Sequence, residues 1–192
     1  MNTDQKIVAV GAASGVVSMM ILVALLYWNL PIPDGMDNPF DRVIFTLRMN
    51  LVAALPLFIG IVTVGNNRFL SEAIDPLRHA EDRATIINGR FVDNTLQQNF
   101  LFLVGTLALS TFLEAASMKL MVALTLVFVI ARIVFWIGYR DPLYRAPGMA
   151  ATIYMNLCII VSVLYFLIFW CKKSVMISKE GWENLERWFD AT

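Results

Sequence analysis

The sequence has few charged residues and few of the residue types that bind metals. Only 16% of its 192 residues are Asp, Glu, Lys or Arg, and its single histidine, His79, has no cysteine near it. Metal sites of the zinc type need several Cys, His or carboxylate ligands together, so we predict no metal site. The 15 basic and 15 acidic residues cancel and do not form a basic cluster, which excludes nucleic acid as a partner.

Cysteines are also scarce, and the two present cannot pair with each other. Cys158 and Cys171 lie 13 positions apart in one apolar run. On a helix that separation is about 20 Å, which is far beyond the reach of a disulfide. The cysteines therefore do not indicate whether the protein lies in an oxidising or a reducing compartment.

Apolar residues, in contrast, make up 58% of the chain, and the mean hydropathy is +0.66. This balance is typical of an integral membrane protein rather than a soluble domain. Crossing a bilayer takes about 20 mostly apolar residues in a helix. Five stretches meet that requirement: 7–30, 43–65, 95–113, 118–139 and 148–171. We therefore predict an all-α, multi-pass integral membrane protein with five transmembrane helices, forming a single membrane domain over residues 1–192.

The two ends of the chain carry further signals. The first span, 7–30, is longer than the apolar part of a secretory signal peptide and lacks a cleavage site at its end, so we interpret it as retained. Gly11 and Gly15 in this span have the G-x-x-x-G spacing that lets two helices approach closely. The tail, 178–192, has aromatic residues at helical spacing, which predicts an amphipathic helix in the membrane interface. A frayed tail is the alternative.

Charge does not decide the orientation in the membrane. Seven Lys and Arg residues lie on the side of the N terminus and six on the other, and this difference is too small for the positive-inside rule. The longest connection, about 66–93, is too polar to lie in lipid. We predict a solvated loop with helical extensions there.

One arginine, Arg132, lies about two turns inside the apolar run 118–139. A charge at membrane depth costs at least about 2.5 kcal/mol unless its side chain faces protein or water. Arg132 is therefore predicted to make a buried functional or structural contact. Arginines at the ends of spans, such as Arg68 and Arg145, have a simpler interpretation than ligand binding, because their side chains can extend to lipid headgroups.

Two polar stripes approach the same membrane boundary. Arg90, Asn94 and Gln97 follow one another at i, i+4 and i+7, so they project from one face of a helix. Arg132 and Tyr139 are likewise seven positions apart on the next span. Guanidinium groups bind carboxylates and phosphates through paired hydrogen bonds, so converging arginines favour an anionic ligand. The cations expected in this cluster are Arg68, Arg90, Arg132 and Arg145.

These residues resemble motifs of the MAPEG family, the membrane-associated proteins in eicosanoid and glutathione metabolism. The stretch 90–98, RFVDNTLQQ, resembles the R-x-x-x-N-x-x-E signature of that family. Ala131-Arg132, with Gly138-Tyr139 and Arg145 after it, resembles the A-R, G-Y, R series further along. The resemblance covers about 43–171 and implies an antiparallel four-helix bundle, preceded here by the additional span.

The resemblance also implies how the protein assembles and what it binds. It implies a homotrimer with a cytoplasmic N terminus and glutathione bound between subunits. Arg145 is then the residue that activates the glutathione thiolate, since a nearby cation favours the ionised thiol. The remaining residues implied to contact glutathione are Arg68, Arg90, Asn94, Gln97, Arg132 and Tyr139.

Gln97 stands where catalytic members of the family carry a glutamate that receives the glutathione amino group, so catalysis stays open. The first hypothesis is a non-catalytic MAPEG-like trimer whose arginine-lined pocket binds a lipid or a glutathione-like anion. In this hypothesis it acts in membrane and secretory regulation with lipids and other membrane proteins, and in a eukaryote it lies in an endomembrane of the ER, Golgi or endolysosomes. The alternative is a glutathione-dependent transferase, peroxidase or isomerase for lipophilic electrophiles. A channel or transporter is disfavoured, because we see no internal repeats.

Overall fold

The computed structural model of the protein describes residues 2–71, 81–141 and 144–190, with side chains up to Phe169. Every regular element in these ranges is a helix, so the all-α prediction is confirmed. In chain order the elements are α1 (Thr3–Asn29), α2 (Pro39–Ala53), α3 (Leu55–Phe69), α4 (Arg83–Ser110), a 3-10 turn (Ala115–Ser117), α5 (Lys119–Gly138) and α6 (Ala146–Asp190). His79 and the side chains of the tail 178–192 lie outside the described residues, so the interfacial position of the tail stays a prediction.

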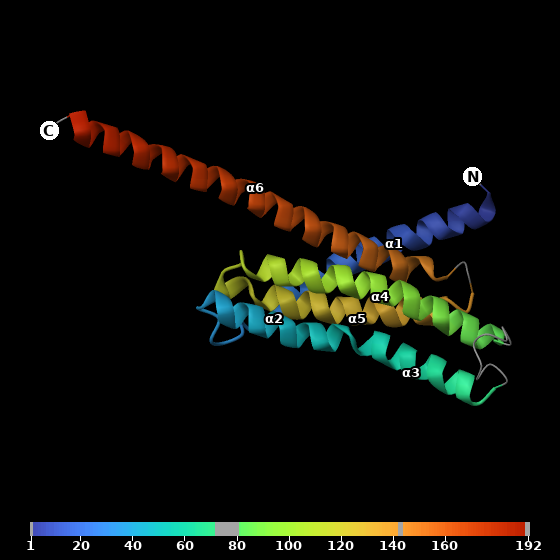
Figure 1. Ribbon diagram of the computed structural model, residues 1–192. Helices are drawn as coiled ribbons and strands as arrows, with labels where there is room; N and C mark the ends of the chain where they lie inside the picture. Colours follow the sequence, from blue (N-terminus) through green and yellow to red (C-terminus); the bar gives the residue numbers. More distant parts are fainter. Residues whose placement is uncertain (1, 72–80, 142–143, 191–192) are drawn as a thin grey trace.

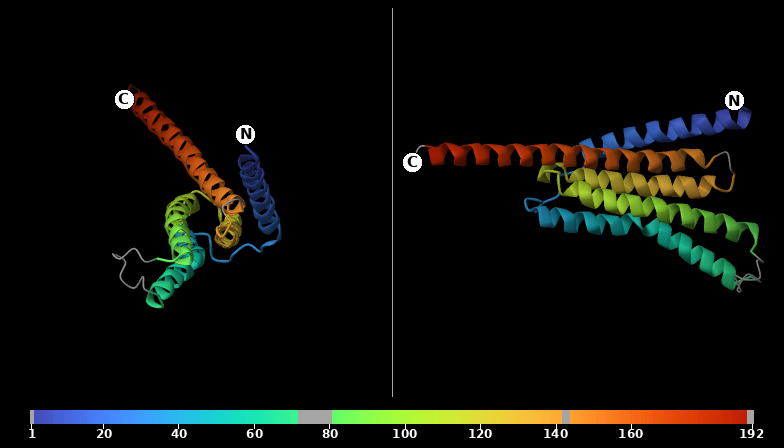
Figure 2. Two further views of the ribbon diagram at one scale, coloured as in Figure 1. Left: turned by 90° about the vertical axis from the view of Figure 1, so that its right-hand side faces the viewer. Right: turned by 45° about the horizontal axis from the view of Figure 1, so that its top comes forward.

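The helices form an elongated bundle (Figure 1). Helices α2 and α3 follow each other along α4, and α5 packs against α2 and α4. The outer helix α1 packs against α6 and α5, and Figure 2 shows α1 and α6 together on one side of the bundle. Helix α6 continues well beyond the other helices toward its C-terminal end (Figure 1).

Four helical segments of the described chain are long and apolar enough to cross a membrane. They are Thr3–Asn29, Pro39–Phe69, Ala115–Gly138 and Ala146–Phe169. Helix α4, which contains the predicted span 95–113, is not among them although its 28 residues extend about 42 Å. Three successive amides, Gln97, Gln98 and Asn99, lower its hydropathy. A fifth transmembrane helix therefore stays a prediction.

The polar side chains of α4 bond to neighbouring helices. Asn156 Nδ2 on α6 donates to Gln98 Oε1 at 2.9 Å, and Asn50 Nδ2 on α2 donates to Thr106 Oγ1 at 2.9 Å. Lipid offers no hydrogen-bond partners, so such pairing allows amides and hydroxyls to lie inside an apolar bundle. Part of the polarity of α4 is thus satisfied within the protein.

Helices α2 and α3 are separated by a break at Ala54. Pro56 follows two residues later, and proline lacks the N–H that a continuous helix would use there. The buried side chain of Asn99 on α4 donates from Nδ2 to the Ala53 carbonyl oxygen at 3.2 Å. An amide from the neighbouring helix therefore satisfies a backbone acceptor beside the break.

Replacing Asn99 by leucine is expected to destabilise the protein by about 1–2 kcal/mol. The Ala53 carbonyl would lose this donor inside the bundle, and a buried acceptor without a partner is costly. The thermal midpoint in detergent measures the effect. Gln97→Leu is the matched control, because the exposed Gln97 is an amide on the same helix. Equal midpoints for the two variants would contradict this role of Asn99.

Small residues allow α1 to approach α6 closely. A methyl carbon added at Gly15 would lie 2.6 Å from Pro147 Cα, and one added at Gly11 would lie 3.4 Å from the Pro147 ring. Close approach at the G-x-x-x-G pair is thus confirmed, with the first turn of α6 as the surface it meets. Gly148 has the same function between α6 and α5, where an added carbon would lie 2.8 Å from Phe135 Cα.

Candidate functional site

Arg132 lies inside the bundle, between α5 and α4. Its side chain is 0% exposed, and its Nη1 donates to Asn94 Oδ1 at 3.0 Å. The guanidinium carbon lies 4.2 Å from the centroid of the Phe135 ring, in cation–π contact. Nε and Nη2 have no hydrogen-bond partner within the described part of the chain. A buried guanidinium with one neutral hydrogen-bond partner is unusual in an apolar bundle.

Aromatic packing fixes the helix interface next to this arginine. The Phe91 ring of α4 stacks on Trp136 of α5 with centroids 4.6 Å apart, and Trp136 Nε1 donates to Asn88 Oδ1 at 2.9 Å. Phe91 and Phe135 are both almost completely buried. These contacts hold α4 against α5 on the turn adjoining Arg132.

The aromatic series continues from Arg132 to the end of α5. Phe135 meets Tyr139 edge to face, with ring centroids 5.2 Å apart. The guanidinium carbon of Arg145, which precedes α6, lies 5.1 Å from the Tyr139 ring centroid. Gly138 permits this arrangement, because a carbon added there would lie 3.0 Å from Arg145 Cα. Two arginines are thereby joined through two aromatic rings.

A separate polar pocket lies between α3 and α4. Its volume is about 510 Å³, and its charged lining residues are Arg68, Glu81, Arg90 and Asp93. Arg68 Nε donates to Glu81 Oε1 at 3.0 Å. Arg90 is exposed and makes no hydrogen bond or ion pair with another described residue. We call this the α3–α4 pocket.

Asp82 fixes the start of the helix that carries Arg90. The Asp82 carboxylate caps α4 by accepting from the Thr85 backbone N–H at 2.8 Å. Hydrogen bonding to Thr85 holds the pKa of the Asp82 carboxyl below its usual value. The cap is therefore ionised at neutral pH, and negative charge at a helix N terminus is favourable.

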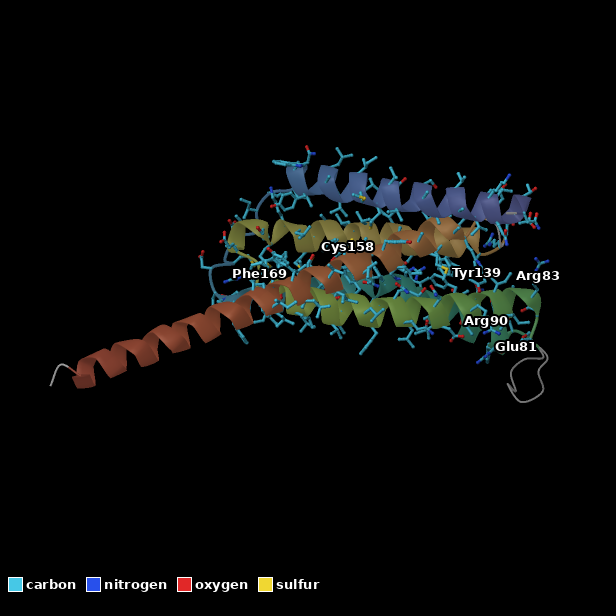
Figure 3. All side chains as sticks on the ribbon, turned by 90° about the horizontal axis from the view of Figure 1, so that it is seen from above. Glu81, Arg83, Arg90, Tyr139, Cys158 and Phe169 are labelled. Carbon is cyan, nitrogen blue, oxygen red and sulfur yellow. The ribbon has the colours of Figure 1, made fainter. Side chains whose placement is uncertain are left out.

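The predicted site residues fall into two groups rather than one hollow. Asn94, Arg132, Tyr139 and Arg145 lie along the α4–α5 interface and the α5–α6 connection. Arg68 and Arg90 line the α3–α4 pocket. Gln97 is exposed on α4 and lines neither group. Figure 3 shows Arg90 and Tyr139 at the same end of the bundle. The binding roles of all these residues stay predictions.

Two carboxylates in the pocket were absent from the sequence-based site. Asp93 follows Arg90 at i+3, so the two share a helix face. Glu81 lies just before α4 and reaches the end of α3. The i+3 spacing was a usable signal for Asp93, whereas the position of Glu81 depends on how the chain returns from α3 to α4.

Comparisons with known proteins identify similar membrane proteins. The chain is 26% identical over 165 residues to Transmembrane protein 79 of Mus musculus, covering 83% of this chain and 42% of the relative. It is 25% identical over 164 residues to Transmembrane protein 79 of Bos taurus, covering 85% of this chain and 41% of the relative. The chain is similar to Transmembrane protein 79. It spans about two fifths of the length of these curated relatives.

These findings correct the MAPEG assignment made from the sequence motifs. No family model matches the chain, and the relatives found are Transmembrane protein 79, also called mattrin. No solved structure matches either. A resemblance of the chain to the membrane portion of mattrin agrees in name with these relatives, but the comparisons do not test the five spans. The protein is a multi-pass membrane protein. The predicted division into a first span, 7–30, and a four-helix bundle, 43–171, remains untested.

Proposed function

We propose that this membrane protein binds an anion that also carries an ammonium group, in the α3–α4 pocket. The observation that supports the proposal is the charge pattern of the pocket, where two arginines and two carboxylates surround about 510 Å³. That volume lies within the range of about 300–1,000 Å³ that small-ligand pockets occupy. A ligand with both charges satisfies this lining better than a simple anion, which the carboxylates would repel.

The two arginines have different roles in this proposal. Arg68 is already paired with Glu81, so it shapes the pocket. Arg90 has no hydrogen-bond or ion-pair partner among the described residues, and its guanidinium can offer two parallel N–H donors to a carboxylate or phosphate. Asp93, one helical turn away, accepts the ammonium group of the same ligand.

Two sources supply this chemistry. The headgroup of an aminophospholipid such as phosphatidylserine carries phosphate and ammonium, and glutathione carries carboxylates and ammonium. We favour the lipid, because Arg145, the predicted thiolate-activating residue, contacts the Tyr139 ring and is not part of the pocket lining. The role that we favour is in regulating endomembranes, with other membrane proteins as partners. Glutathione-dependent catalysis is the second candidate.

Arg90→Gln is expected to weaken ligand binding about tenfold, because a charge-assisted hydrogen bond contributes about 1.5 kcal/mol or more. The full chain in nanodiscs is titrated with glutathione by calorimetry, and its lipid preference is measured by native mass spectrometry with phosphatidylserine against phosphatidylcholine. Arg83→Gln is the matched control, an exposed arginine on the same helix outside the pocket. Figure 3 shows both arginines at this end.

The outcomes separate the two sources. Selective retention of phosphatidylserine that is lost in Arg90→Gln supports a lipid headgroup. Calorimetric heat for glutathione that Arg90→Gln removes, with a conjugation rate that collapses in Arg145→Ala, supports the enzyme. Identical binding by the Arg90→Gln and Arg83→Gln variants would overturn the pocket. Asp93→Asn adds a check on the ammonium contact, because it should weaken aminophospholipids but not phosphatidic acid.

The homotrimer stays an untested prediction, because the comparisons do not support the family that implied it. It was inferred from the family resemblance, and the mass of the detergent-free complex tests it directly. A mass equal to one or two chains of 21.6 kDa would exclude it.

A further inference from the structure

A second hollow lies between α1, α5, α6 and the end of α4. Its volume is about 520 Å³, and we call it the α1 groove. Most of its lining is apolar, with Met, Val and Leu side chains from all four helices. The lining residues used below are Tyr27 and Trp28 at the end of α1, Ala24 one turn earlier, and Leu113 after α4.

The α1 groove is far from the arginine groups. It includes Cys158 on α6, which Figure 3 shows well separated from Arg90 and Tyr139 along the bundle. Its end is marked by Trp28, whose side chain is 79% exposed. Indole rings favour the membrane–water interface, so Trp28 places this end of the groove at the headgroup level.

Positive charge lies at the same end. Lys119 Nζ, at the start of α5, is 4.5 Å from the centroid of the Tyr27 ring. Arg42 of α2 donates from Nη1 to the carbonyl oxygen of Leu113, another lining residue. Both cations are half-buried. The apolar lining is thus flanked at one end by two cations that contact lining residues, while the Glu114 carboxylate next to Leu113 is exposed there.

We propose that the α1 groove holds an acyl chain of an anionic phospholipid, with the lipid phosphate beside Lys119. The apolar lining fits the chain, and the cationic rim complements the phosphate. A neutral lipid fills the apolar part equally well but gains less from the rim. The groove therefore selects lipids by charge, independently of the ligand proposed for the α3–α4 pocket.

The test uses brominated phospholipids, which quench tryptophan fluorescence at short range. The chain of 192 residues is placed in bilayers that contain either brominated phosphatidic acid or brominated phosphatidylcholine. The part of the quenching that is lost in the Trp28→Phe variant comes from Trp28, and it therefore reports lipid bound in the α1 groove. We expect a relative binding constant about fivefold in favour of phosphatidic acid, because one lysine near an anionic surface contributes about 1 kcal/mol.

Four variants test the interpretation. Lys119→Gln should reduce the preference markedly, toward onefold, whereas Lys6→Gln, which removes an exposed cation from the opposite end of α1, should leave it unchanged. Ala24→Phe should abolish the preference by filling the groove from an exposed position. Equal quenching by the two lipids, or a preference that survives Lys119→Gln and Ala24→Phe, overturns the proposal. Arg90→Gln should not change it, so failure here and failure of the α3–α4 pocket are distinguishable.

Discussion

Arg132→Met is expected to leave the purified protein as stable as the parent or more stable, by up to about 4 kcal/mol. The guanidinium is fully buried, with one hydrogen bond and one ring contact. Removing a charge from water costs several kcal/mol, and replacing buried ionic groups by apolar side chains of similar size is often neutral or stabilising by about 1–4 kcal/mol. Methionine fits this site, because its flexible side chain fills irregular space.

Arg132→Lys is expected to have the opposite effect. The ammonium group remains a buried charge but loses the planar contact with Phe135 and the geometry of the hydrogen bond to Asn94. We expect a loss of about 1–3 kcal/mol. Thermal unfolding in one detergent compares the two variants.

The opposite signs make the comparison decisive. If methionine destabilises the protein as much as lysine does, the guanidinium contributes to stability through its contacts with Asn94 and Phe135, which contradicts the expectation. If methionine is tolerated, the charge is retained for a reason other than stability. A double variant with Asn94→Leu then measures the coupling of the pair, because Asn94 Oδ1 is the partner that remains.

The helices and the position of Arg132 follow from the sequence in a direct physical way. Long apolar runs must form helices in lipid, and a cation inside such a run must face protein. The contact between Arg132 and Asn94 agrees with the two polar stripes. The periodicity of the sequence does not specify which neighbouring helix each face of a helix contacts. Arg90 and Asn94 are only about 40° apart around α4, yet Arg90 lines a pocket toward α3 and Asn94 bonds to α5.

That division has a structural cause. Helix α4 packs against α2, α3, α5 and α6, so a small rotation around its axis changes the neighbour that a side chain meets. The spacing i, i+4 identifies a stripe, but the break at Ala54 decides how α3 passes along α4. The carboxylate of Glu81 enters the pocket from the connection before α4. Such tertiary features have no local signal.

The family assignment was wrong for a related reason. A helix that begins at the membrane surface commonly carries an arginine near its end, where the side chain can reach headgroups. Amides one or two turns further inside commonly bond to adjacent helices, as Gln98 does with Asn156. Arg-x-x-x-Asn therefore satisfies general requirements of membrane bundles, and a short match does not identify a family.

Gly15→Leu is expected to destabilise the protein by about 1–3 kcal/mol and to move α1 away from α6. A carbon added at Gly15 meets the backbone of Pro147, with 2.6 Å to its Cα. A flexible side chain could move aside, but the first turn of α6 cannot, because it also packs on α5 through Gly148. The helix α1 must therefore shift. Thermal unfolding and the distance between spin labels on α1 and α6 measure both effects.

Gly65→Leu is the matched control, since no atom lies within 4 Å of a carbon added there. Its thermal midpoint should stay near that of the parent, and equal losses for Gly65→Leu and Gly15→Leu would contradict the proposed contact. The shift of α1 also has a functional readout, because Tyr27 and Trp28 of α1 form the rim of the α1 groove. Gly15→Leu should therefore reduce the preference for anionic lipid while the α3–α4 pocket, which contains no residue of α1, keeps its ligand.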